Sequence, residues 1–190
     1  MRRLSLAAVV AAAIAATGCG TTQAIRPLGR GGLRAELSLG GPFFDNVGVP
    51  IPMPLALVGA RYGVIDRLDV HARWHVTPAA FGTFGLDAGA SGLILEQNGW
   101  IPALSGGVLL TLITDAQETN VFPEFTLAAS WDVYRGSLVY FGLTIFYQFA
   151  PFFQYHPALF VGGRWQATNR FGLTLELKWI SFHPVSYTHL

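Results

Sequence analysis

The sequence predicts an all-β protein, an antiparallel transmembrane β-barrel of about eight to ten strands. Charged residues make up 12% of the 190 residues, about half the usual ~25% of soluble domains, while aromatic residues reach 13% and glycine occurs 22 times. Apolar and polar residues alternate with a period of two in one segment after another, which is the signature of a strand. A soluble domain of this length would have difficulty hiding so much apolar surface from water.

An export signal precedes the predicted strands. Arg2 and Arg3 are followed by an apolar stretch, residues 4–16, that is too short to span a bilayer stably. This order of a positive region and a short apolar region predicts a signal peptide over residues 1–18.

The end of this signal contains the only cysteine of the chain. The letters "ATGC", which end at Cys19, resemble the bacterial lipobox, and this resemblance implies lipidation of Cys19, although Ala16 stands where that motif usually has Leu. Ordinary cleavage after Ala15 is the alternative, and it would leave an awkward free thiol in an exported protein. By resemblance to the lipoprotein sorting rule, Gly20 favours the outer membrane. Residues 19–32 are then expected to form a polar tether.

The barrel is predicted to occupy residues 33–182. The stretch "LDVHARWHVT", residues 68–77, alternates without a fault, with Val70 and Trp74 on one face and His71 and Arg73 on the other. Eight further stretches show clear or weaker alternation. The nine predicted strands cover residues 33–39, 55–62, 68–77, 84–95, 105–114, 124–134, 138–149, 158–167 and 173–179.

Residues 137–163 allow a second interpretation, because they contain no Asp, Glu, Lys or Arg and are long enough for a transmembrane helix. Gly142, Gln148, Pro151 and Pro157 argue against that helix, as does the period of two. We therefore expect strands here.

The assignment of the two faces distinguishes a membrane barrel from a soluble one. In an outer-membrane barrel the apolar residues face lipid and the polar residues line the interior, whereas a soluble lipocalin-like barrel has the opposite arrangement. The polar faces here carry Gly, Ser, Thr and isolated charges. The connections tend to alternate between long ones, including 114–123, and short ones. Large aromatic residues near strand ends fit a girdle at the membrane interfaces, and they are Trp74, Trp131, Tyr147, Trp165 and Trp179.

Two segments carry a family resemblance. "RYGVIDRLDVHARW" and "ATNRFGLTLELKW" resemble the strand–turn–strand segments of small Gram-negative outer-membrane β-barrel proteins. The resemblance covers residues 33–182 and brings no functional residues with it. It implies location in the bacterial outer membrane, with outer-membrane lipid and the barrel assembly machinery as partners.

The number of strands and the C-terminal tail do not match a complete barrel of this class. Nine strands is an odd number, whereas bacterial single-chain barrels have an even number. The final letters "VSYTHL" resemble translated sequencing-adapter sequence, so we expect residues 183–190 to be non-native and a tenth strand to be missing. Eight real strands are the alternative.

The polar faces supply candidate chemistry. Asp69 and His71 could touch as the orienting half of a hydrolase dyad, but Ser91 and Ser130 lie in no nucleophile motif. His71 and His75 would be about 13 Å apart on one strand, too far to share a metal. We instead expect a lumen filled by a network of balanced charges, formed by Arg34, Glu36, Asp69, His71, Arg73, His75, Asp87, Asp132, Arg164, Glu176 and Lys178.

These observations predict a lipid-anchored outer-membrane barrel with a packed polar lumen and a structural or interaction role. We expect no catalysis, no cofactor and no metal, since the remaining histidines, His156, His183 and His189, lie in predicted loops or the tail. The net charge of +1 argues against a nucleic-acid partner. Three alternatives remain: a narrow channel or small-ligand carrier, a membrane-embedded lipid-modifying enzyme, and a soluble lipocalin-like barrel on a lipid anchor.

Overall fold

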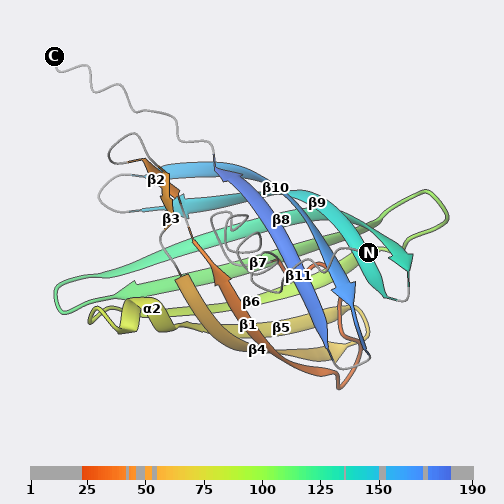
Figure 1. Ribbon diagram of the computed structural model, residues 1–190, viewed down its shortest axis with the longest axis horizontal. Helices are drawn as coiled ribbons and strands as arrows, with labels where there is room; N and C mark the ends of the chain where they lie inside the picture. Colours follow the sequence, from red (N-terminus) through yellow and green to blue (C-terminus); the bar gives the residue numbers. More distant parts are fainter. Residues whose placement is uncertain are drawn as a thin grey trace, which may run out of the picture.

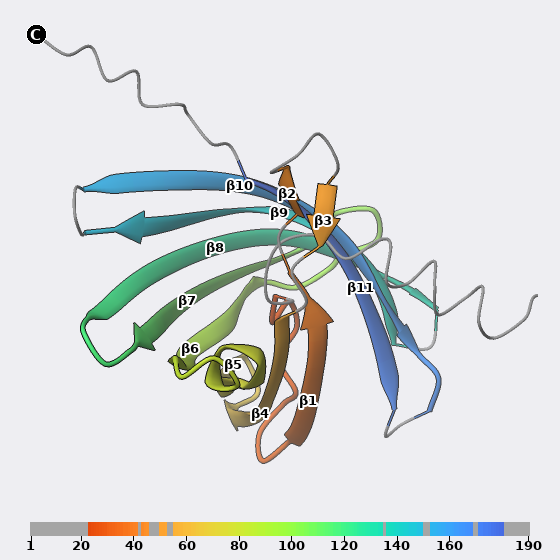
Figure 2. The same cartoon turned by 60° about the vertical axis from the view of Figure 1, so that its left-hand side comes forward.

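The computed structural model contains one curved antiparallel sheet of nine strands that forms a half-barrel (Figures 1 and 2). It describes residues 23–41, 43–45, 50–52, 55–134, 136–149, 153–168 and 171–180. The strands of this sheet are β1 (Leu33–Gly40), β4 (Leu55–Ile65), β5 (Leu68–His75), β6 (Phe84–Leu95), β7 (Ala103–Thr114), β8 (Thr119–Tyr134), β9 (Ser137–Gln148), β10 (Gln154–Gln166) and β11 (Gly172–Ile180). The hairpin of β2 (Phe43–Asp45) and β3 (Pro50–Pro52) and the one-turn helix α2 (Val76–Ala79) complete the described elements. The prediction of an all-β antiparallel fold is confirmed.

Every strand of the large sheet pairs with its neighbour along the chain, in the order β1-β4-β5-β6-β7-β8-β9-β10-β11. We call the end of the sheet that carries the β4–β5, β6–β7, β8–β9 and β10–β11 connections the turn end, and the opposite end the loop end. Because the number of strands is odd, β1 and β11 both run from the turn end to the loop end. Among the described residues, no strand pairs with the outer edge of either one.

The alternation of apolar and polar residues in the sequence gives the two faces of the sheet different surfaces. The strand register places Leu37, Val58, Trp74 and Leu86 side by side across four strands, and the neighbouring chain positions point to the other face. On the convex face these residues and most other large apolar ones are exposed. On the concave face many inward residues are charged, hydroxylated or glycine, and a smaller apolar group that includes Leu138 and Phe160 lies among them. The sheet is therefore apolar outside and mainly polar inside.

Of the expectations about individual segments, one is confirmed and one is wrong. The strands expected within residues 137–163 are present as β9 (Ser137–Gln148) and β10 (Gln154–Gln166), which pair antiparallel. The connection expected over 114–123 is only four residues long, because β8 begins at Thr119. In this tight turn the backbone N–H groups of Glu118 and Gln117 donate hydrogen bonds to Asp115 Oδ1, which lowers the pKa of Asp115.

The N-terminal segment is not a free tether in its described part, residues 23–32. The peptide groups of Gly31 and Gly32 exchange hydrogen bonds of 2.8 Å with Gly63 near the turn end. From there the segment runs along the concave face toward the loop end, and its Ile25 side chain is buried in an apolar cluster with Ala128, Leu138, Tyr140 and Phe160. Residues 19–22 and the signal peptide lie outside the described residues, as does the tail, residues 183–190.

Inward glycines create the space for large inward side chains. Gly162 lies opposite Tyr140 in the register, and a Cβ atom on Gly162 would come within 2.4 Å of the Tyr140 ring. The same relation recurs across the sheet, in the pairs Gly59–Arg73, Gly89–His71 and Gly142–Phe160. The glycine content of the sequence therefore fits the close packing of the concave face.

Candidate functional site: the charged concave face

The concave face holds most of the buried charges of the described residues, and they form three clusters. The first centres on Arg61 of β4, whose guanidinium lies 2.7 Å from Asp69 Oδ2 and 3.7 Å from Glu36 Oε1. Asp69 also accepts the backbone N–H of Leu28, and Arg61 donates to the carbonyl oxygen of Arg26. Arg61 and Asp69 are 3% and 0% exposed, so this ion pair is closed off from solvent. The cluster fastens the N-terminal segment to the sheet.

The second cluster centres on Asp87 of β6. Its carboxylate accepts hydrogen bonds of 2.8 Å from Thr111 Oγ1 and pairs with His75 Nε2 at 2.8 Å, while Arg73 Nε lies 3.5 Å away. Arg73 and Thr111 are its direct register partners on β5 and β7. A buried carboxylate is costly unless it is paired and hydrogen-bonded. These three partners compensate the buried charge of Asp87.

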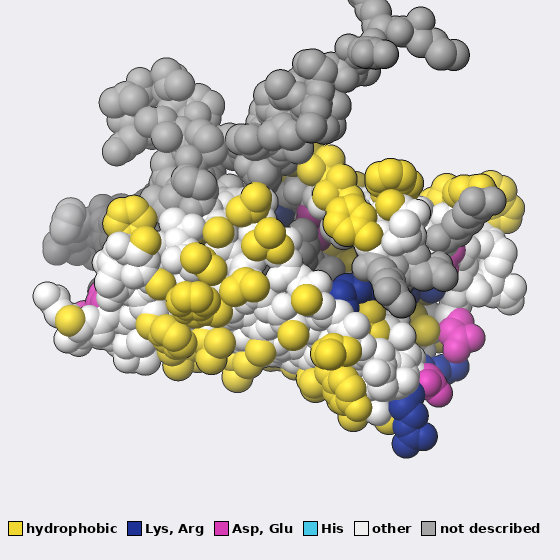
Figure 3. Space-filling view, turned by 60° about the horizontal axis from the view of Figure 1, so that its bottom comes forward, with side chains coloured by type: hydrophobic (Ala, Val, Ile, Leu, Met, Phe, Trp, Pro, Cys, Tyr) yellow, Lys and Arg dark blue, Asp and Glu magenta, His cyan; other side chains and the backbone are white. Residues whose placement is uncertain are grey.

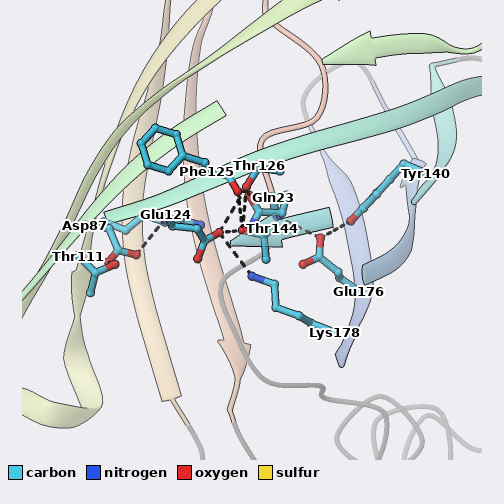
Figure 4. Close-up of polar contacts among 11 residues, drawn as sticks. Gln23, Asp87, Thr111, Glu124, Phe125, Thr126, Tyr140, Thr144, Glu176 and Lys178 are labelled. Carbon is cyan, nitrogen blue, oxygen red and sulfur yellow. Dashed lines mark hydrogen bonds and ion pairs between the residues drawn. The ribbon is translucent and has the colours of Figure 1, made fainter. Parts of the chain in front are cut away.

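The third cluster joins the last strands to the N-terminal segment (Figure 4). Lys178 Nζ of β11 lies 3.6 Å from Glu124 Oε1 of β8, and Gln23 Nε2 donates to that carboxylate at 2.7 Å. Glu176 accepts hydrogen bonds from the Gln23 backbone N–H at 3.1 Å and from the Tyr140 hydroxyl at 2.9 Å. Gln23 therefore bridges β8 and β11 across the interior.

Arg26 fixes the N-terminal segment near the turn end. Its guanidinium donates to Ser130 Oγ at 2.8 Å and to Gln97 Oε1 at 3.2 Å, and it forms an ion pair of 3.1 Å with Asp132. The side chain of Asp132 is 50% exposed, because it lies close to the turn end of β8. Asp132 belongs to the rim of the half-barrel, whereas the sequence places it in the lumen.

A small cavity of about 10 Å³ lies between the N-terminal segment and the sheet, lined in part by His71, Ser91, Ser105 and Ile25. His71 Nδ1, Ser91 Oγ and Ser105 Oγ are buried without a hydrogen-bond partner. The expected contact of Asp69 with His71 does not form, because Asp69 is occupied by Arg61 and the Leu28 N–H. Ser91 and His71 line the same cavity, but no hydrogen bond joins them.

The structure brings most of the predicted charged residues to the concave face. Arg34 and Glu36 of β1, His71, Arg73 and His75 of β5, and Arg164 of β10 all point inward at positions that are buried or half-buried. Arg164 Nε is buried without a hydrogen-bond partner. His156 lies within β10, stacked on Phe146 with ring centroids 4.8 Å apart, and not in a loop as expected.

Sequence reasoning missed four residues of the network: Gln23, Arg26, Arg61 and Glu124. Arg61 lies in the strand with the weakest alternation, where it shares the inward face with Leu57 and two glycines. Glu124 is the first residue of the predicted strand 124–134 and was not assigned to a face. Gln23 and Arg26 lie in the segment interpreted as a tether, and no local pattern marks their partners more than 70 residues away.

The contacts on the concave face mainly hold the N-terminal segment and the strands together, and they do not arrange reactive groups for catalysis. Each carboxylate of the three clusters is held by cations, hydroxyl groups or peptide N–H groups. Within the described ranges, no three His, Cys, Asp or Glu side chains lie close enough together to hold a metal ion. The helices found there include none that is long and apolar enough to span a membrane.

Comparisons with known proteins add no family. No protein-family model matches the sequence, and no similar chain was found among curated proteins or solved structures.

Proposed function

We propose that this protein is a lipid-anchored β-barrel protein of the bacterial outer membrane, with a packed polar interior and a structural or interaction role. The observation that carries the proposal is the inverted distribution of side chains. The convex face is apolar and exposed, while Arg61, Asp69, Arg73 and Asp87 are almost completely buried on the concave face. A soluble barrel has the opposite arrangement, and a membrane barrel has this one.

The extent of the exposed apolar surface supports lipid as its environment. The space-filling view shows hydrophobic side chains spread over the face of the sheet, with the few charged ones mostly near the edges of the view (Figure 3). Leu33, Leu37, Phe141 and Leu173 are all more than half exposed. Soluble monomers rarely expose contiguous apolar patches larger than a few hundred Å².

The five aromatic residues of the predicted girdle form two groups at different heights. Trp74, Tyr147 and Trp179 lie near the loop ends of β5, β9 and β11, whereas Trp131 and Trp165 lie near the turn ends of β8 and β10. Trp and Tyr concentrate at both interfaces of a bilayer, where their polar atoms meet water and their rings meet lipid. Two aromatic belts on an apolar face fit insertion across a membrane.

The contents of the interior favour a packed barrel over the alternatives. Residues 23–30 occupy the concave face and are held by side chains of β5, β8 and β11. A narrow channel would require this segment to move. A lipid-modifying enzyme would require an activated nucleophile, and the candidate pair of Asp69 and His71 is not in contact.

The position of Gln23 constrains the proposed lipid anchor. Cys19 precedes Gln23 by four residues, and a fully extended chain of four residues spans at most about 14 Å. Gln23 contacts Glu124, which lies nearer the loop end than the turn end of β8. A lipid on Cys19 would therefore attach within about 14 Å of Gln23.

Membrane insertion can be tested by the electrophoretic mobility of the full chain, folded in detergent and in liposomes. A membrane barrel resists unboiled SDS because its backbone hydrogen bonds are shielded. We expect a folded band that shifts on boiling, and protection of the strands from protease only when liposomes are present. A protein that stays folded and monodisperse in water without detergent, with no shift on boiling, would contradict the proposal.

A further inference from the structure

The half-barrel has two open edges, formed by the end strands of the sheet. Within the described residues, the outer N–H and C=O groups of β1 (Leu33–Gly40) and β11 (Gly172–Ile180) have no partner strand. An open sheet edge in hydrocarbon leaves backbone groups unpaired at several kcal/mol each. If the proposed membrane location is correct, on which this inference rests, both edges must pair with another strand.

The two edges lie apart, and the interior between them is occupied (Figure 2). A barrel of about eight strands encloses a space that its own side chains fill or that holds one small ligand. Here the interior also contains a length of backbone, residues 23–32, with the side chains of Gln23, Ile25 and Arg26. The nine described strands of one copy do not close around these contents.

We propose that a second copy of this chain closes the half-barrel, so that two nine-stranded sheets form one eighteen-stranded barrel. Two copies inserted in the same direction are related by a two-fold axis along the membrane normal, which places β11 of each copy beside β1 of the other. Because β1 and β11 run in the same direction, the two seams are parallel. Barrels of 16–18 strands have lumens wide enough for a channel, so the two N-terminal segments fit inside.

The charges on the two edges are complementary in one register of this seam. When Glu176 of β11 lies beside Arg34 of β1 in the partner copy, Lys178 falls beside Glu36, and all four side chains point inward. Shifting the register by two residues in one direction places Glu176 beside Glu36. The same shift in the other direction places Lys178 beside Arg34. Only the complementary register avoids both like-charge contacts, and like charges directly opposite destabilise a sheet.

The outward residues agree with the same register. It places Leu175 beside Leu33, Leu177 beside Ala35 and Trp179 beside Leu37, all of which are apolar. The Arg34 side chain has no hydrogen bond or ion pair with another described residue, whereas the edge carboxylates Glu36 and Glu176 already have partners in their own copy. The seam would give Arg34 a carboxylate.

Cysteine cross-linking tests this seam directly. In a Cys19→Ser background, the pair Ala35→Cys and Leu177→Cys is introduced into the full chain, which is folded into liposomes and treated with a short thiol cross-linker. We expect a covalent dimer in most of the protein. The control pair Ala35→Cys and Leu173→Cys, displaced by four residues, should cross-link at least five-fold less. Arg34→Glu should reduce the dimer several-fold by placing it beside Glu176, whereas Arg30→Glu, an exposed residue, should not.

The outcomes separate this inference from the proposed function. A cross-linked monomer would show that the two edges close within one copy, and no cross-link in protein that is inserted and protease-protected would show that another strand covers them; either result overturns the dimer. Equal cross-linking in both registers would overturn the assigned seam. Protein that does not insert into liposomes at all contradicts the membrane proposal itself.

Discussion

Replacing Arg61 with Ala is expected to lower the free energy of unfolding by about 3–5 kcal/mol, the usual cost of breaking a buried ion pair. Asp69 is completely buried and would lose its only cation within 4 Å among the described residues. The Arg26 carbonyl oxygen would lose its donor as well. Urea unfolding of protein folded in detergent micelles measures the change.

Arg67→Ala is the matched control for Arg61→Ala. Arg67 pairs with Glu96 at 2.5 Å, but both side chains are more than half exposed, and exposed pairs contribute about 0–1 kcal/mol. The double variant Arg61→Met/Asp69→Leu should recover part of the loss, because it removes both buried charges. Equal effects of the two single arginine variants would contradict the buried role of Arg61.

The second large effect is expected at Ile25, the main apolar anchor of the N-terminal segment. Ile25 is 4% exposed and packs against the sheet side chains Leu138, Tyr140 and Phe160. Ile25→Ala should lower the free energy of unfolding by about 2–5 kcal/mol, as other large-to-small changes in a core do. It should also expose the segment to limited proteolysis before the strands unfold.

Leu28→Ala provides the comparison for Ile25→Ala, because Leu28 lies in the same segment but is only half-buried. We expect a smaller loss of stability and little change in the protease pattern. If Ile25→Ala leaves both stability and proteolysis unchanged, then residues 23–30 do not pack in the interior in solution.

The strands of this fold can be predicted from the sequence, because all side chains on one face of a strand lie in the same environment. Leu173, Leu175 and Leu177 alternate with Thr174 and Glu176 since the first group points outward and the second inward. The strand count, the antiparallel order and the face of every predicted inward charge on β1, β5 and β11 follow from that pattern. Strand ends are less readable, as the early start of β8 at Thr119 shows.

Which charged side chains pair with each other cannot be predicted from the alternation, because the pairs form diagonally between neighbouring strands. Arg61 lies directly opposite His71, yet its guanidinium pairs with Asp69, two residues away on the same face of β5. A reading of one strand alone pairs Asp69 with His71, its neighbour on the same face. The N-terminal segment has no periodicity at all, and its place is set by contacts with residues far along the chain.

In the proposed membrane barrel the convex face meets lipid and the concave face does not. A scan of single spin-labelled cysteines in a Cys19→Ser background tests it on β9, which is paired on both sides, with β8 and β10. In liposomes, labels at Val139, Phe141 and Leu143 should be accessible to oxygen, which concentrates in lipid, while labels at Tyr140 and Thr144 should not. An inverted period of two, or equal access to a water-soluble relaxation agent at all five positions, would contradict the account.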